Sequence, residues 1–322
     1  MTEFVYGNTP PLFGRRVVRD ISDMRGLDAV VIGIPWEGTV TWGTWSGCEL
    51  GPKVMRHASL RYSGFLPEYG LDIWEHLQIG DYGDCAVVSQ NVEATFAAAE
   101  KMTREVLAAG AIPLVLGGDH AVPIPVVKAL AEHHVGKRIG VIQYDAHYDN
   151  REHHEGERYA RNCPMSRIAE TPGVLADRVV QIGIRGPRNA RWGAAYAERT
   201  GAKVYTPLDI RRLGIEEVTR QAIAIAHDGT DLVYVTVDSD VLDQAYNPGG
   251  PPDPGGISSL ELLISLFAVG QAGIAGADVV EIYPPKDPAG ASAHAMVWAL
   301  LYLLGGVAEA RRASRIADVA SP

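Results

Sequence analysis

The sequence has few cysteines, and none of them lie close together. They are Cys48, Cys85 and Cys163, and no CxxC pair occurs in the 322 residues. An odd number of cysteines at wide spacing predicts neither a disulfide framework nor a zinc knuckle. We therefore expect a reducing, cytoplasmic location, where structural disulfides are rare.

Targeting segments, membrane spans and an excess of basic residues are also missing. No basic region followed by an apolar core opens the chain, so no secretory signal is expected. No apolar run reaches the roughly 18–20 residues of a membrane span. The longest, 291–306, contains His294 and predicts a buried helix. The net charge of −10 argues against nucleic acid and is compatible with a cationic small substrate.

No repeat, low-complexity segment or Pro/Ser-rich linker divides the chain, so we expect a single domain over residues 1–322. Residues 1–28 would be an extension that packs on this domain or on a neighbouring subunit. Apolar, β-branched runs alternate with amphipathic stretches, which is typical of parallel βαβ units. The expected strands are 29–34, 112–116, 140–144, 179–184, 232–237 and 277–282, and the expected helices are 92–109, 123–134, 215–226 and 258–272.

Potential metal ligands follow three of the expected strands. Asp145, His147 and Asp149 stand at every second position after one strand, a spacing that points side chains to the same face of extended chain. Asp238 and Asp240 follow a second strand, and Gly117-Gly-Asp-His120 follows a third. Ligands of open α/β sheets bind beyond the carboxyl ends of the strands, so these groups are expected to meet.

The six side chains predict a site for two divalent cations, because four carboxylates can balance a charge of +4. They are His120, Asp145, His147, Asp149, Asp238 and Asp240. Oxygen-rich ligands with some imidazole favour manganese, with nickel as the alternative, and the lack of thiolate disfavours zinc. Paired metals activate water, so hydrolysis is the expected reaction class.

These motifs resemble those of the ureohydrolases, the family of arginase, agmatinase and guanidinobutyrase. The matching segments are Gly117-Gly-Asp-His120, Asp145-Ala-His-Tyr-Asp149, Val237-Asp-Ser-Asp-Val-Leu-Asp243 and, more weakly, Gly33-Ile-Pro35 and Val279-Val-Glu281. The resemblance implies a single-domain α/β/α sandwich with a mainly parallel sheet of about eight strands. It also implies a homo-oligomer, a trimer or hexamer, while a hetero-oligomer with a paralogue is a further possibility.

Residue roles follow from the resemblance. It implies that His120, Asp145, Asp149 and Asp238 surround one metal, and Asp145, His147, Asp238 and Asp240 the other. Glu281 would grip the guanidinium of the substrate through paired hydrogen bonds; its alternative is an ordinary glutamate at the start of a helix. Asp149 would carry a proton while a metal-bridging hydroxide attacks the guanidinium carbon.

The chain departs from the family where a His-Gly pair is expected. Asn162-Cys163 stands there instead, and Asn162 cannot carry a proton as the family's histidine is thought to do. His153 or His154 could substitute, although a pair of solvated loop histidines is the simpler interpretation. We assign Asn162 and His154 to substrate binding.

The loop before Gly47 also departs from the family, because it carries tryptophans where arginines are common. Trp42 and Trp45 could form a wall facing a cationic substrate, and Trp45 is assigned to substrate binding. Packing within the loop or at a subunit contact is the alternative. No residue is obviously placed for an α-amino-acid carboxylate.

The sequence thus predicts an amidine hydrolase of linear C–N bonds that releases urea and an amine from a guanidino compound without an α-amino acid group. Compounds like agmatine, guanidinobutyrate, guanidine and substituted guanidines or biguanides fit this description. The alternative is a catalytically impaired subunit that stabilises or regulates an active partner, which the missing histidine favours. A deacetylase-like metalloenzyme is a weaker alternative, since it would need one zinc and fewer carboxylates.

Overall fold

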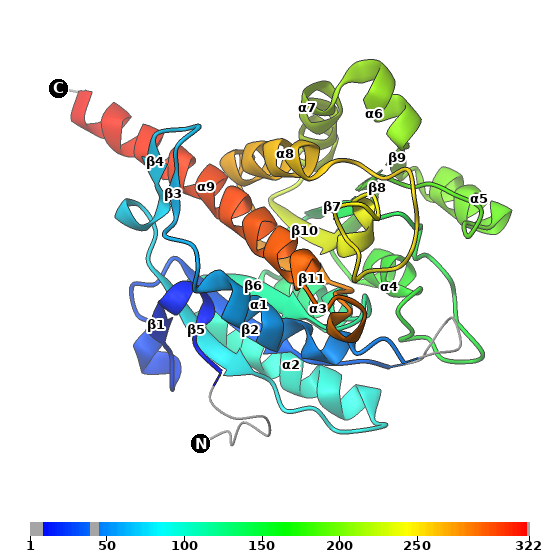
Figure 1. The fold of residues 1–322 in the computed structure, drawn as a ribbon, viewed down its shortest axis with the longest axis horizontal. Helices are drawn as coiled ribbons and strands as arrows, with labels where there is room; N and C mark the ends of the chain where they lie inside the picture. The colour runs from blue at the N-terminus through cyan, green and yellow to red at the C-terminus, as the bar shows by residue number, and fades with distance from the viewer. Residues whose placement is uncertain (1–8, 39–44, 321–322) are drawn as a thin grey trace.

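A nine-stranded sheet runs through the centre of the molecule (Figure 1). The structure, a computed structural model, describes residues 9–38 and 45–320. The strand order is β1-β5-β2-β6-β11-β10-β7-β8-β9, and every pair of neighbours is parallel. The strands are β1 (Arg16–Val17), β2 (Ala29–Ile34), β5 (Ile79–Asp84), β6 (Ile112–Gly117), β7 (Ile139–Tyr144), β8 (Val174–Ile182), β9 (Lys203–Tyr205), β10 (Leu232–Asp238) and β11 (Gly276–Val280).

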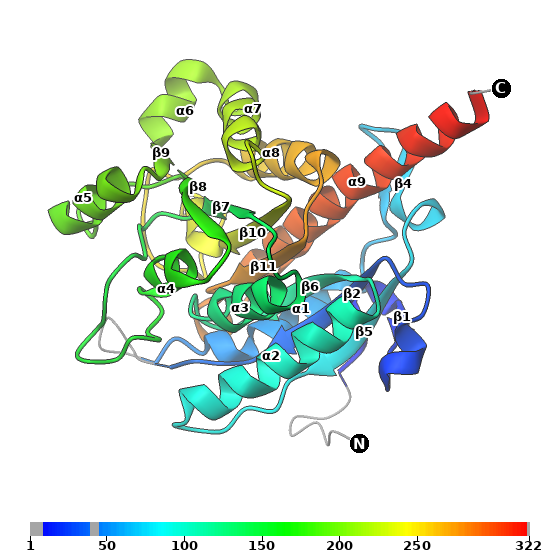
Figure 2. The same ribbon diagram turned by 180° about the vertical axis from the view of Figure 1, so that it is seen from behind.

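Helices cover both faces of this sheet. On one face lie α1 (Gly51–Ser59), α7 (Ile215–Ala226), α8 (Ser259–Ala272) and α9 (Ala291–Ala320). On the other lie α2 (Val92–Ala108), α3 (Pro123–His133) and α4 (Pro164–Glu170), in front in Figure 2. Two short helices, α5 (Arg191–Thr200) and α6 (Pro207–Leu213), flank β9, and β3 (Phe65–Leu66) pairs with β4 (Leu71–Asp72) in a separate antiparallel ribbon.

The predicted α/β/α sandwich with a mainly parallel sheet is confirmed. The central strands β2, β7 and β11 are buried at every residue, as strands covered on both faces must be. A capping box of Ser258 and Glu261 opens α8, with both reciprocal hydrogen bonds present. The sheet has nine strands rather than about eight. The expectation missed β1, β5 and β9, which are either two or three residues long or, in β5, rich in Gly and Asp.

The two ends of the chain pack on the domain differently. Within the predicted extension 1–28, Leu12 and Phe13 are buried and β1 pairs with β5 at the edge of the sheet. At the other end, Ala291–Arg315 of α9 is the one described helix that is long and apolar enough to cross a membrane. However, 72% of its most apolar window is buried inside the fold, as in a core helix.

Candidate dimetal active site

The sheet order brings together segments that are far apart in the sequence. The four adjacent strands β6, β11, β10 and β7 end side by side, because Val237 pairs with Tyr144 and Asp238 pairs with Val280. His120, Glu281 and the Asp145–Asp149 segment follow β6, β11 and β7, and Asp238 is the last residue of β10. At Gly118 a Cβ atom would lie 2.0 Å from the carbonyl oxygen of Trp36, so this glycine lets the turn that carries His120 pass close to the backbone.

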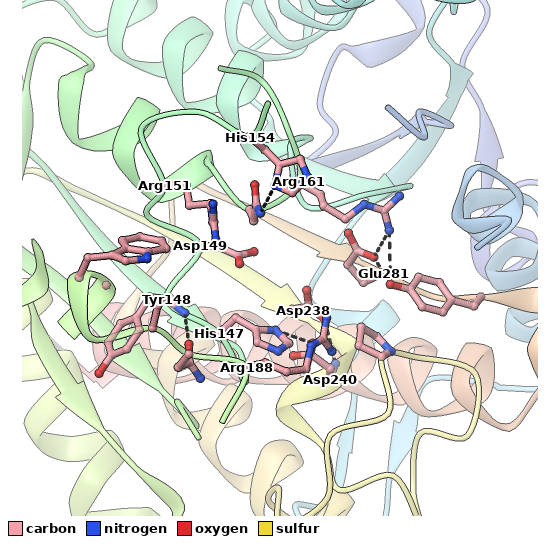
Figure 3. A pocket seen from close by; sticks show the side chains of 17 residues that line it. His147, Tyr148, Asp149, Arg151, His154, Arg161, Arg188, Asp238, Asp240 and Glu281 are labelled. Carbon is pink, nitrogen blue, oxygen red and sulfur yellow. Dashed lines mark hydrogen bonds and ion pairs between the residues drawn. The ribbon is translucent and has the colours of Figure 1, made fainter. Parts of the chain in front are cut away.

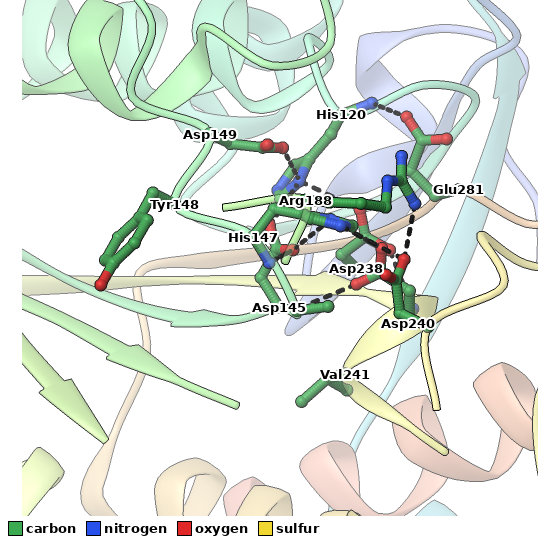
Figure 4. Close-up of polar contacts among 12 residues, drawn as sticks. His120, Asp145, His147, Tyr148, Asp149, Arg188, Asp238, Asp240, Val241 and Glu281 are labelled. Carbon is green, nitrogen blue, oxygen red and sulfur yellow. Dashed lines mark hydrogen bonds and ion pairs between the residues drawn. The ribbon is translucent and has the colours of Figure 1, made fainter. Parts of the chain in front are cut away.

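The first ligand group surrounds Nδ1 of His120. This atom lies 3.0 Å from Oδ2 of Asp145, 3.0 Å from Oδ2 of Asp149 and 3.2 Å from Oδ2 of Asp238 (Figure 4). His120 and Asp145 are fully buried. Asp149 reaches the group through a positive φ of 43°, so it leaves the extended conformation that the every-second-residue spacing predicts. A turn in the backbone, and not strand alternation, aims Asp149 at the group.

The second ligand group shares Asp145 with the first. Nδ1 of His147 lies 3.0 Å from Oδ2 of Asp240 and 3.5 Å from Oδ1 of Asp145. The other ring nitrogen, Nε2, lies 3.2 Å from Oδ2 of Asp253, which Arg188 holds at 2.6 Å. A ligand histidine whose second nitrogen faces a carboxylate is a common arrangement around protein-bound metals. The structure therefore brings all six predicted ligands together in two groups.

The carboxylates of the two groups do not ionise independently. Burial raises the pKa of Asp238 well above its ordinary value, and the neighbouring Asp240 and Asp145 raise it further. Burial and Asp145 raise the pKa of Asp149 to about 6. The pKa of Asp145 is lowered instead, because the neighbouring imidazoles of His120 and His147 outweigh the effect of its burial. Full ionisation of the cluster needs positive charge among these groups.

Hydrogen bonds behind His120 support a cation at its Nδ1. Nε2 of His120 lies 3.0 Å from the hydroxyl of Thr236, which donates to Oδ1 of Asp278 at 2.7 Å. The hydroxyl therefore accepts from Nε2–H, and the neutral ring presents the lone pair of Nδ1 to the three carboxylates. Nδ1 makes no hydrogen bond. A lone pair among carboxylates needs a proton or a cation between them, and two imidazoles with four carboxylates fit a pair of divalent metals.

Glu281 follows β11 with a positive φ of 62° and is almost fully buried. Its Oε1 accepts from the backbone N–H of His120 at 2.8 Å, and its Oε2 accepts from the hydroxyl of Tyr283 at 2.6 Å. Oε2 also accepts from Nη1 of Arg161 at 3.0 Å. The guanidinium of Arg161 thus occupies the carboxylate that was predicted to bind the guanidinium of a substrate.

A pocket of about 250 Å³ opens over the ligand groups. Figure 3 shows side chains from both sides of the pocket pointing into it. Asn162 and His154 line it, whereas His153 is exposed and is not among the described lining residues. The lining residues are His147, Tyr148, Asp149, Arg151, His154, Arg161, Asn162, Arg188, Asn189, Ala190, Trp192, Gly193, Asp238, Asp240, Pro251, Glu281 and Tyr283.

The tryptophan wall is not found in this pocket. Trp45 is 57% exposed, its Nε1 donates to Oε1 of Glu49 at 3.0 Å, and it is not one of the lining residues. Trp42, the second residue of the predicted wall, lies outside the described residues. The aromatic residues that do line the pocket are Tyr148, Trp192 and Tyr283.

Comparison with known proteins finds similarity over most of the chain. The sequence profile of the Arginase family matches residues 27–305. This chain belongs to the arginase family. It is 33% identical to a guanidinopropionase of Pseudomonas aeruginosa, over 88% of each chain. It is 36% identical to a formimidoylglutamase of Halalkalibacterium halodurans, over 75% of this chain and 76% of that one.

A solved structure extends the similarity. The proclavaminate amidino hydrolase of Streptomyces clavuligerus superposes with a TM-score of 0.85 at 29% identity, covering 95% of this chain and 99% of that chain. The comparisons confirm the predicted ureohydrolase family and the predicted enzyme class, a hydrolase of amidine C–N bonds.

Within the arginase-family site, sequence reasoning missed the arginines of the pocket and Asp253. Arg161 stands directly before Asn162, in the segment where the chain departs from the family, yet no spacing pattern marks it. Arg151 and Arg188 belong to loops whose course depends on the fold. Asp253 lies 3.2 Å from His147 but 106 positions from it along the sequence. The sequence signal for Arg161 was its place next to Asn162, a residue already assigned to the substrate pocket.

Proposed function

We propose that this chain is a dimetal hydrolase that cleaves a guanidino compound without an α-amino acid group to urea and an amine. The observation that carries the proposal is the meeting of two imidazoles and four carboxylates at the ends of three parallel strands. Each of these six side chains is at most 15% exposed. A dense cluster of buried ionisable side chains is a feature of metal sites.

The proposed cofactors are two divalent cations, manganese first and nickel as the alternative. Three oxygens join His120 in one group, and oxygens of Asp145 and Asp240 join His147 in the other, a ligand set that suits manganese. When bound, such a pair makes water acidic enough to react at neutral pH. Asp149 lines the pocket within the first ligand group, and we assign it to proton transfer during the reaction.

The pocket supports a substrate that lacks an α-ammonium group. Its lining carboxylates are Asp149, Asp238, Asp240 and Glu281. The first three belong to the ligand groups, and Glu281 is paired with Arg161. Among the lining residues that the structure describes, no carboxylate is left to hold an ammonium. A substrate guanidinium at Glu281 would have to share its Oε2 with Arg161.

A panel of guanidino compounds tests this function. The manganese- and nickel-loaded protein is incubated with agmatine, 4-guanidinobutyrate, guanidine, a substituted guanidine and a biguanide, and urea is measured. Arginine, which carries a free α-amino acid group, provides the contrast. We expect about two metals per chain, turnover of at least one member and poor turnover of arginine. A stable protein with two metals that releases nothing from any member contradicts the proposal.

That outcome would favour the second candidate, an impaired subunit that stabilises or regulates an active partner. Two observations support it, namely Asn162 at the position of the family's histidine and Arg161 on Glu281. Co-purification with a paralogue that restores urea release would establish it. We further propose a cytoplasmic location, given three buried free cysteines, and a homo-oligomer as the assembly of an active chain.

A further inference from the structure

Loop 150–162, which forms one wall of the pocket, is held in a defined shape. The backbones of His154 and Glu157 exchange two hydrogen bonds of 2.8 and 2.9 Å. The two residues between them, Glu155 and Gly156, have positive φ angles of 50° and 91°, the signature of a two-residue type I′ hairpin turn. Glycine adopts this conformation without strain. His154 is therefore fixed at the base of a hairpin.

Asn162 orients the ring of His154. Nδ2 of Asn162 lies 3.1 Å from Nδ1 of His154, and the backbone carbonyl oxygen of Asn162 accepts from the backbone N–H of Arg151 at 3.0 Å. An amide nitrogen can only donate, so Nδ1 accepts and the neutral ring carries its proton on Nε2. The imidazole is thereby held as a hydrogen-bond donor. This is a binding role and differs from the proton-carrying role of the family's histidine.

Arg151 is oriented by a second contact. Its guanidinium carbon lies 4.9 Å from the ring centroid of Trp192, at the start of α5. The side chain of Asn150 donates to the carbonyl oxygen of Gly193 at 2.9 Å and so ties the loop to this helix. None of the described residues offers Arg151 a carboxylate within 4 Å. A stacked guanidinium keeps its in-plane N–H groups available for an anion.

Both oriented donors face the same pocket (Figure 3). Arg151 and His154 lie along the wall opposite Arg188, whose Nη1 pairs with Asp253. The pocket carboxylates near them belong to the ligand groups or to the pair with Arg161. The wall thus offers positive charge and N–H donors, and the described lining residues leave no carboxylate to receive them.

We propose that Arg151 and His154 form a subsite for a carboxylate at the far end of the substrate, with Trp192 and Asn162 as its positioning residues. Within the proposed function, on which this inference rests, the substrate is then a guanidino acid rather than a diamine-like or plain guanidine. Its guanidinium reaches the ligand groups while its carboxylate receives hydrogen bonds from Nη of Arg151 and Nε2 of His154.

Matched substrates that differ only at the tail test the subsite. Guanidino acids of two to five carbons are compared with alkylguanidines of the same length and with agmatine. We expect the best acid to exceed its alkyl counterpart at least about 100-fold in kcat/KM, which corresponds to roughly 3 kcal/mol. Equal values for the two series would overturn the proposal.

Variants separate binding from structure. Arg151→Met should lower this preference at least tenfold, through a higher KM for the acid, and Arg151→Lys should restore part of it. Arg158→Gln is the control, an exposed arginine of the same loop that pairs with Glu170. His154→Gln and Asn162→Ala should each cost several-fold, and the double variant no more than His154→Gln alone. An unchanged preference in Arg151→Met would overturn the subsite.

Ligand-binding measurements distinguish failure of the subsite proposal from failure of the proposed function. If the metal-loaded chain hydrolyses nothing, calorimetry with 4-guanidinobutyrate and butylguanidine still measures the preference. Tighter binding of the acid that is lost in Arg151→Met supports the subsite in a chain without turnover. Equal dissociation constants overturn it, whatever the activity.

Discussion

The ligand groups and loop 150–162 face the same pocket but are built differently. The ligands follow central strands whose neighbours fix them on both sides, and His120, Asp145, Asp238 and Asp240 are almost fully buried. The loop is anchored by a hairpin turn, an amide and a stacked tryptophan, and many of its residues are exposed. The sheet thus positions the six candidate ligands, and the proposed role of the loop is to select the substrate.

The two regions meet at Glu281 and Arg161. Glu281 comes from a strand end and ties the backbone of His120, whereas Arg161 comes from the loop. Arg161 also pairs with Glu37 at 3.2 Å, so one guanidinium links the loop, the end of β11 and the segment after β2. A substitution in the loop that displaces Arg161 would therefore also affect Glu281 and, through it, the backbone of His120.

The largest effect is expected from a substitution on the strand-end side. Asp145→Asn and Asp238→Asn should each remove bound metal and lower turnover by about 10³-fold or more, because the metals supply several kcal/mol of transition-state stabilisation. Metal analysis and urea release provide the measurement. Asp231→Asn, just before the opposite end of β10, is the matched control and should keep both. Full metal content in Asp238→Asn would break the assignment of this region.

The next effect concerns the contact between the regions. Arg161→Ala leaves Glu37 and Glu281 buried without their shared cation, so unfolding should become easier by about 3–5 kcal/mol. Guanidinium ion at low millimolar concentration should bind in the vacated place and recover part of the loss, measured by thermal unfolding. Equal concentrations of sodium chloride and urea are the controls, and no recovery specific to guanidinium would refute the pairing. Arg161→Lys should lose less, since it keeps the charge.

A smaller effect is expected from pH. The folded state raises the pKa of Asp149 to about 6, so it binds this proton more tightly than the unfolded chain does. The metal-free protein should therefore lose stability as pH rises from about 4 through 6, by about 1–3 kcal/mol. Added manganese competes with the proton, so its stabilising effect should grow between pH 5.5 and 7.5. Calorimetry of unfolding checks both trends, and Asp149→Asn should flatten the first.

The strand-end region could be predicted because its rule is local. An apolar run followed by Asp or His places a ligand wherever the strand lies in a parallel sheet, and Asp145, His147 and Asp238 all obeyed this rule. The capping box at Ser258 is equally local. Asp149 reaches the other ligands for a different reason. Its backbone has a positive φ, which the every-second-residue spacing does not predict.

The loop could not be predicted, because its contacts join residues without a repeating pattern. The stacking of Arg151 on Trp192 depends on where α5 begins, and the pairing of Arg161 with Glu281 joins positions 120 residues apart. The resemblance to the family marked Asn162 only as the loss of a proton-carrying histidine. The structure gives Asn162 a partner in His154, eight residues before it.

The smallest effect should come from Trp45, the one predicted substrate contact that the described pocket does not include. Its ring is 57% exposed and its Nε1 donates to Glu49, so truncation removes little buried surface. Trp45→Ala should change kcat/KM by less than about twofold and stability by at most about 0.5 kcal/mol, as for other surface substitutions. Trp192→Ala is the matched comparison, since it should loosen Arg151 and raise KM for a guanidino acid. A large loss of kcat/KM in Trp45→Ala with none in Trp192→Ala would show that Trp45, and not Trp192, contributes to substrate binding.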